Sequence, residues 1–120
     1  MDAIIYQAKA MMTKMPTCDN AIYMVGLLQE EAGELQGKIN KALRKGQIRF
    51  DNNQLIFNGN FEEQMAFEDE LKKELGDVCW AAAGIAEVFG WELGEAMQGN
   101  LDKLADRHKR GVIDGKGDNR

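Results

Sequence analysis

"LLQEEAGELQ", residues 27–36, sets the architecture of the chain, because it places acidic side chains inside a helical apolar pattern. At about 100° per residue, Glu31 projects among the leucines of this segment, and Glu34 lies within about 20° of Leu27 around the helix. Glu30 falls at the margin of the same face. Two carboxylates therefore belong to the inward face of a predicted helix.

The chain on either side of this segment predicts four helices and one small hairpin. Apolar residues recur at threes and fours in each helix, whereas residues 47–57 alternate about a turn at Asn52 and Asn53. The expected elements are a helix over 3–14 that ends before Pro16, a loop over 15–20, a helix from a cap at Asp19 or Asn20 to just before Gly46, a hairpin over 47–57, a helix from Glu62 to Gly90, a helix over 92–110 with Leu93, Met97, Leu101 and Leu104 facing inward, and an irregular tail.

The 120 residues suit a single domain spanning 1–120, with 44% hydrophobic residues available for a core. The apolar stripes of the two long helices are too wide for one helix pair to cover. The sequence therefore predicts an all-α helical bundle that is completed by dimerisation, most simply as a homodimer, with a small β-hairpin inserted near 47–57.

Composition excludes several classes of function. The net charge of −5 provides no basic footprint for nucleic acid, so no nucleic-acid partner is expected. Cys18 and Cys79 show no zinc or disulfide spacing, which favours a reducing, cytoplasmic setting. No segment reaches the roughly 18 apolar residues of a membrane span, so a soluble protein without a membrane partner is expected.

A second acidic pair occurs in "LKKELGDVCWA", residues 71–81, where Glu74 and Asp77 lie one turn apart at the apolar stripe. Like charges buried together cost several kcal/mol per ion, and a divalent cation removes this cost. Carboxylate-only sites suit Mg²⁺ or Mn²⁺, and Mg²⁺ is often shared with substrate phosphates. The alternatives are pairing with Lys or Arg, solvated faces, or a di-iron site, which needs Glu-x-x-His pairs although the single histidine, His108, lies far from both motifs.

"EEAGE" at 30–34, followed by "ELGD" at 74–77, resembles the EExxE…ExxD signature of the MazG-like all-α nucleoside triphosphate pyrophosphohydrolases. The resemblance runs from about Met24 to Arg120 and includes "NLDKLADRHKRGVIDGKGDNR", which is similar to the C-terminal segment of small bacterial and phage members. It implies a helical bundle assembled as a dimer or dimer of dimers. It also implies Mg²⁺-dependent cleavage of a nucleoside triphosphate between the α and β phosphates.

Position on the helices and the same resemblance together suggest roles for individual residues. Glu30 or Glu34 is the candidate to orient or deprotonate the attacking water, because each lies on the turn that carries Glu31. Three residues of the last predicted helix, Asn100, Lys103 and Arg107, are spaced three and four residues apart and so share one helix face. By resemblance the metal ligands are Glu31, Glu34, Glu74 and Asp77, and the phosphate-binding residues are Asn100, Lys103 and Arg107.

Two departures from the family pattern stand out. Residues 35–73 form an unusually long separation between the acidic motifs, and no N-terminal tryptophan is present to stack a base. The sequence leaves open a specialist for dUTP, dCTP or dGTP. It also leaves open a helical dimer without catalytic activity that binds nucleotides or a protein partner.

Overall fold

The computed structural model describes the whole chain, residues 1–120, as four α-helices and one two-stranded sheet. The all-α class with a small hairpin insertion is confirmed. In chain order the elements are α1 (Ala3–Met11), a short 3-10 turn η1 (Pro16–Cys18), α2 (Ala21–Arg44), β1 (Ile48–Asp51), β2 (Gln54–Phe57), α3 (Phe61–Val88) and α4 (Leu93–Arg110).

Side-chain caps fix where the long helices begin. The Asn20 side chain accepts a hydrogen bond from the backbone N–H of Tyr23 at 2.7 Å, and Asn60 does the same for Glu63 at 2.8 Å. Of the two residues expected to cap α2, Asn20 is therefore the one that does so. Helix α1 ends at Met11, earlier than expected, because the Thr13 hydroxyl and backbone N–H both donate to the Ala10 carbonyl and tighten the chain into a turn.

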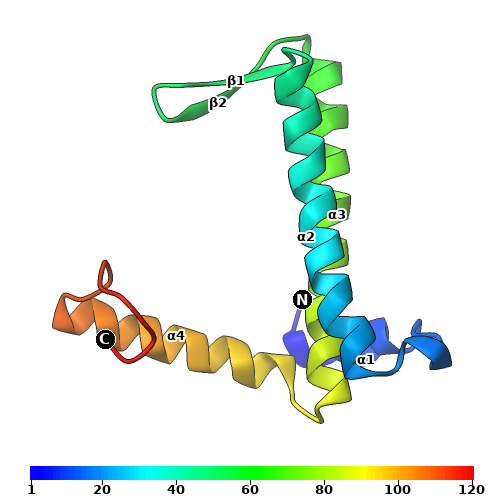
Figure 1. Cartoon of the computed structure of the whole chain (residues 1–120), viewed down its shortest axis with the longest axis vertical. Helices are drawn as coiled ribbons and strands as arrows, with labels where there is room; N and C mark the ends of the chain where they lie inside the picture. Colours follow the sequence, from blue (N-terminus) through cyan, green and yellow to red (C-terminus); the bar gives the residue numbers. More distant parts are fainter.

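Helices α2 and α3 run side by side in opposite directions and form the long body of the molecule (Figure 1). The two helices are in tight contact at Gly84 of α3, where a β-carbon would lie 2.3 Å from the Met24 sulfur of α2. Met24 is completely buried at this crossing. The absence of a side chain at Gly84 is therefore what lets the two helices pack closely at this end.

Helix α1 packs across the end of α3 through two polar anchors. Gln7 is buried, donates to the Trp91 carbonyl at 2.9 Å and accepts from the Leu93 N–H at 2.7 Å. The Trp80 indole N–H donates to the Ala10 carbonyl at 3.2 Å and to the Thr13 hydroxyl at 3.0 Å. Trp80 therefore fastens α1 to α3.

The hairpin forms as predicted, with Ile48 opposite Phe57 and Asp51 opposite Gln54. Asn52 and Asn53 have φ values of 51° and 61°, the conformation of the tight turn that suits the twist of a hairpin. The Phe57 ring packs against Phe67 of α3 with 5.7 Å between ring centres. This contact holds the base of the hairpin to the α2–α3 pair.

The single chain is open rather than closed around a core. The hairpin and α4 project from opposite ends of the α2–α3 pair toward the same side (Figure 1). The accessible surface is 8890 Å², whereas a compact chain of this mass exposes about 6,500 Å². The radius of gyration is 17.8 Å, against about 13.6 Å for a compact domain of this length.

The expectation that α4 turns its apolar residues inward is wrong for the isolated chain. Met97 is 52% exposed, Leu101 59% and Leu104 40%. The reason is the direction of α4, which leaves the α2–α3 pair after Gly90 instead of packing along it (Figure 1). None of the helices combines the length and apolar character that a membrane-spanning segment needs.

Candidate metal centre

The antiparallel α2–α3 pair brings the two acidic motifs together. Glu31 comes from α2, and Glu74 and Asp77 come from α3. Each of these three residues offers a carboxylate oxygen, and the three oxygens all lie within 4.8 Å of one another. This distance matches the spacing of ligand atoms around one cation, because Mg²⁺ and Ca²⁺ bind carboxylate oxygens at about 2.0–2.6 Å.

Two oxygens of this cluster have no partner in the protein. Oε2 of Glu31 and Oε2 of Glu74 are buried and make no hydrogen bond. An unpaired buried acceptor costs about 1–3 kcal/mol, and a charged one costs more, so such atoms are rare in folded proteins. A divalent cation with oxygen ligands would satisfy both atoms, and the cluster therefore fits a metal such as Mg²⁺ or Mn²⁺.

The electrostatics of the cluster favour the same interpretation. Loss of hydration raises the pKa of Glu31 above its ordinary value, and the negative charges of Glu34 and Asp77 raise it further. A hydrogen bond with Glu74 is the main cause that raises the pKa of Glu34. Negative charge is thus unfavourable here without a cation, because a proton is held more tightly than on an ordinary glutamate.

Glu34 and Glu30 lie at the edge of the cluster. Glu34 is exposed and reaches Glu74, whereas the three closest carboxylates do not include it. Glu30 is also exposed, and its charge contributes to the raised pKa of Glu31. Both side chains are open to solvent on the turn that carries Glu31.

The structure does not bring the expected phosphate-binding residues to the carboxylates within one chain. Asn100, Lys103 and Arg107 lie on α4, which runs away from the α2–α3 pair (Figure 1). Asp118 of the C-terminal tail accepts from Lys103 at 3.2 Å, and its backbone and side-chain oxygens accept from Arg107 at 2.7 and 3.2 Å. These two contacts, with the Lys103 hydrogen bond the larger cause, hold the pKa of Asp118 below its ordinary value.

Comparison with known proteins places the chain. Residues 20–112 match the family described as the MazG nucleotide pyrophosphohydrolase domain. The chain belongs to this MazG family. It is also 40% identical over 98 residues to the Gene 37 protein of Mycobacterium phage L5, across 82% of this chain and 75% of the phage protein. No solved structure matches the chain.

Membership of the MazG family supports nucleotide pyrophosphohydrolase activity in general. The matched segment begins at Asn20, the cap of α2, and ends just after α4, so it contains both acidic motifs and the hairpin between them. The carboxylate cluster agrees with the general metal dependence of the MazG family.

Sequence reasoning missed Lys38 of the MazG domain. Its ammonium group lies 3.1 Å from Glu70 and 3.4 Å from Oε1 of Glu74, so it neutralises part of the charge at the edge of the cluster. The signal was present in its spacing, because Lys38 follows Glu34 by one helical turn and Glu31 by two. That Glu74 of α3 is the partner of Lys38 could not be predicted, because it depends on how α2 and α3 are aligned along each other.

Proposed function

We propose that the protein is a Mg²⁺-dependent nucleoside triphosphate pyrophosphohydrolase. It would cleave a ribo- or deoxyribonucleoside triphosphate between the α and β phosphates, releasing the monophosphate and pyrophosphate. The observation that carries this proposal is the pair of buried, unpartnered oxygens of Glu31 and Glu74 on two different helices. Family membership supplies the class of reaction. We also propose that residues 1–120 act as one domain.

The metal ligands in this proposal are two carboxylates from each long helix. Mg²⁺ is the expected ion, with Mn²⁺ as a substitute, because both prefer oxygen ligands. When bound, the ion would supply positive charge that offsets the phosphates and makes a nearby water more acidic. The proposed ligands are Glu31, Glu34, Glu74 and Asp77.

Glu34 or Glu30 would orient the attacking water and accept its proton. Glu34 is the stronger candidate, because it reaches Glu74 at the edge of the cluster. Its exposed side chain also leaves room for water beside the cluster. Glu30 has the same exposure without the contact to Glu74.

We further propose that Asn100, Lys103 and Arg107 bind phosphate oxygens, and that a second copy of the chain brings them to the carboxylates. Within one chain α4 leads away from the cluster, as described above. A homodimer, alone or as half of a dimer of dimers, is supported by the excess of about 2,400 Å² of exposed surface over a compact chain. Interfaces of permanent homodimers bury about 2,000–5,000 Å² in total, so this excess is enough to form one.

The test is an assay of the purified protein with Mg²⁺ and each of the eight common ribo- and deoxyribonucleoside triphosphates. We expect monophosphate and pyrophosphate from at least one substrate. Glu74→Gln should lower turnover by about 100-fold or more while the helix content by circular dichroism stays unchanged, because one ligand and its charge are lost. Glu62→Gln, an exposed change on the same helix, is the matched control.

Two results would contradict the proposal. Release of inorganic phosphate with a diphosphate product would place the cleavage at the wrong bond. Full activity of Glu74→Gln would remove the carboxylate cluster from the reaction. Activity with a single substrate would identify a specialist enzyme.

A further inference from the structure

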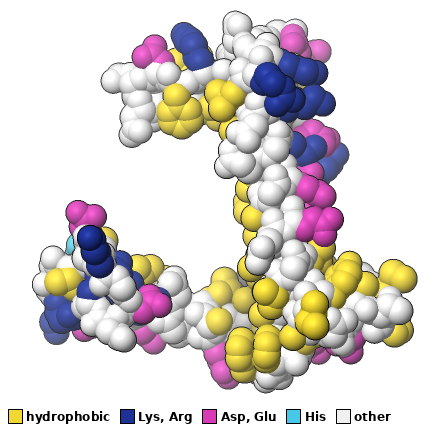
Figure 2. Space-filling model, viewed as in Figure 1, with side chains coloured by type: hydrophobic (Ala, Val, Ile, Leu, Met, Phe, Trp, Pro, Cys, Tyr) yellow, Lys and Arg dark blue, Asp and Glu magenta, His cyan; other side chains and the backbone are white.

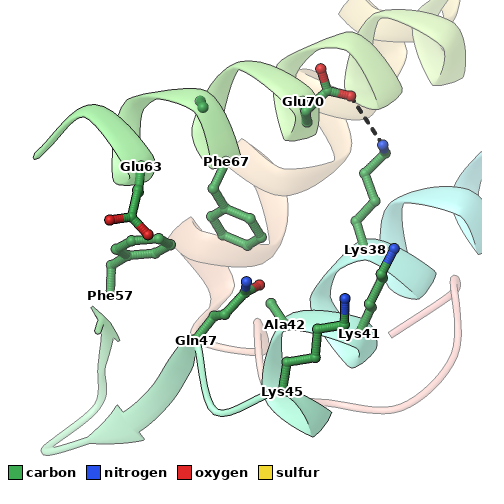
Figure 3. A pocket seen from close by; sticks show the side chains of 10 residues that line it. Lys38, Lys41, Ala42, Lys45, Gln47, Phe57, Glu63, Phe67 and Glu70 are labelled. Atoms are coloured by element: carbon green, nitrogen blue, oxygen red, sulfur yellow. Dashed lines mark hydrogen bonds and ion pairs between the residues drawn. The ribbon is translucent and has the colours of Figure 1, made fainter. Parts of the chain in front are cut away.

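A pocket lies at the hairpin end of the α2–α3 pair, on the same two helices as the carboxylate cluster. Its volume is about 420 Å³, within the range of small-molecule sites. Helix α2 contributes Lys38, Lys41 and Lys45 to its lining, and Phe57 of the hairpin and Phe67 of α3 contribute aromatic rings. The lysine ammonium groups and the Phe67 ring project toward the same space (Figure 3).

The pocket has three lysines and two glutamates in its lining, so it carries a small positive charge on an acidic protein. The chain carries a net charge of −5, yet the three lysines recur at intervals of three and then four residues on one face of α2. Lys41 and Lys45 form no ion pair, whereas Lys38 is paired with Glu70. Lys and Arg side chains gather at this end of the helix pair (Figure 2). Two free ammonium groups on one wall of a pocket favour a phosphate group.

The other side of the pocket carries two aromatic rings and the carboxylates of Glu63 and Glu70, of which Glu70 is paired with Lys38. The Phe57 and Phe67 rings are half-buried and meet at an angle of 36°. The side-chain amide of Gln47 also lines the pocket and makes no hydrogen bond within the protein. Flat aromatic walls take up nucleobases by stacking, and a free amide can bond to a base edge. Phosphate and aromatic base together define a nucleotide.

The pocket lies apart from the carboxylate cluster on the same helix pair. Lys45 is eleven residues beyond Glu34, which is a rise of about 16.5 Å along α2. Lys38 stands between the two sites, because it lines the pocket and also contacts Glu74. We propose that this pocket is a second nucleotide site, distinct from the metal centre, in which Lys41 and Lys45 hold the phosphates and Phe57 and Phe67 contact the base. This site goes beyond the proposed hydrolysis.

The experiment measures binding of ATP by titration calorimetry with EDTA present. Without a divalent cation the carboxylate cluster repels phosphates, so the part of the signal that depends on Lys41 and Lys45 reports the lysine pocket. We expect one ATP per chain, weaker binding of inorganic triphosphate, and an affinity about tenfold or more lower in the Lys41→Ala/Lys45→Ala double variant, because two charge-assisted contacts are lost. The Lys9→Ala/Lys116→Ala double variant removes the same charge elsewhere and should bind as the unchanged chain does.

Asp77→Asn separates this proposal from the hydrolase proposal. It changes the metal centre and should leave ATP affinity in EDTA within about twofold, since the two sites are distinct. A change in ATP affinity in Asp77→Asn as large as the change in the lysine double variant, in either direction, would place the nucleotide at the metal centre and overturn the second site. Unchanged binding in the lysine double variant, or no ATP binding at all, would also overturn it. Equal affinities for ATP and triphosphate would refute the role of the aromatic wall.

Discussion

Gly84→Ala tests the close approach of the helices that carry the carboxylates. The new β-carbon would lie 2.3 Å from Sδ of Met24, 3.0 Å from its Cε and 3.2 Å from its Cγ, whereas packed heavy atoms sit at about 3.5–4.0 Å. Met24 is completely buried, so its side chain must move within the packed interior. Three atoms of one side chain must therefore shift together.

The expected loss follows from two opposing effects. Overpacking of this kind costs about 1–3 kcal/mol, and contact with Cγ as well as the end of the side chain places this site in the upper half of that range. Alanine recovers about 0.8–1 kcal/mol of helix propensity relative to glycine. We expect Gly84→Ala to lower the free energy of unfolding by about 1–2 kcal/mol, or about 4–8 °C in melting temperature.

Gly76→Ala is the matched control on the same helix, because its β-carbon would meet no atom within 4 Å. We expect it to raise stability by about 0.5–1 kcal/mol. The assay is urea and thermal unfolding followed by circular dichroism, at one protein concentration and with EDTA present. In a Met24→Ala background, the Gly84→Ala change should become neutral or stabilising, because the contact is gone.

Equal stability changes for Gly84→Ala and Gly76→Ala would refute this reasoning. The result also bears on the candidate site, because Glu31 lies two turns from Met24 along α2 and Asp77 lies two turns from Gly84 along α3. Spreading the helices at the crossing would move the two carboxylates apart.

Two further predictions concern protons and assembly. The pKa of Glu31 is raised in the folded chain, so its contribution to stability in EDTA is fully present below the ordinary glutamate pKa and is lost as the pH rises through the raised value. Mg²⁺ binding requires that this proton leaves. Stabilisation of the fold by Mg²⁺ should therefore grow over the same pH range. Melting curves between about pH 4 and pH 8 check this, and Glu31→Gln should remove both trends; a Glu31→Gln profile parallel to that of the unchanged chain would contradict it. Sedimentation at micromolar concentration should give a mass of at least twice 13.4 kDa, and Leu101→Lys, at a 59% exposed position of α4, should weaken that assembly. A monomer at that concentration would exclude the proposed dimer.

The sequence predicts those features that depend on local chemistry. The apolar period of α2 and its cap at Asn20 appear in the structure, as does the hairpin turn at Asn52 and Asn53. The proximity of Glu31 and Glu74 could also be predicted, because carboxylates on the apolar faces of two helices are best tolerated when they share a cation. Their role as metal ligands stays a prediction.

Other features depend on contacts between distant segments and could not be predicted. Helix α1 ends where the Thr13 hydroxyl donates a hydrogen bond to the Ala10 carbonyl. This bond competes with the helical hydrogen bonds, and the spacing of apolar residues in the sequence does not reveal it. The direction of α4 is not set by burial of its own apolar side chains, because Met97, Leu101 and Leu104 stay exposed. Lys38 reaches Glu74 only in the observed register of α2 on α3.

The C-terminal tail carries an acidic residue, Asp118, that competes with other anions for Lys103 and Arg107 of α4. Asp118 holds both Lys103 and Arg107, and Arg107 is only 4% exposed beneath the tail. Any anion that binds these two residues must exchange with a carboxylate that is always present at high local concentration. A singly charged anion gains little from that exchange, whereas a polyphosphate brings more charge than it displaces. If Lys103 and Arg107 bind phosphate as proposed, the tail would favour highly charged groups over singly charged anions.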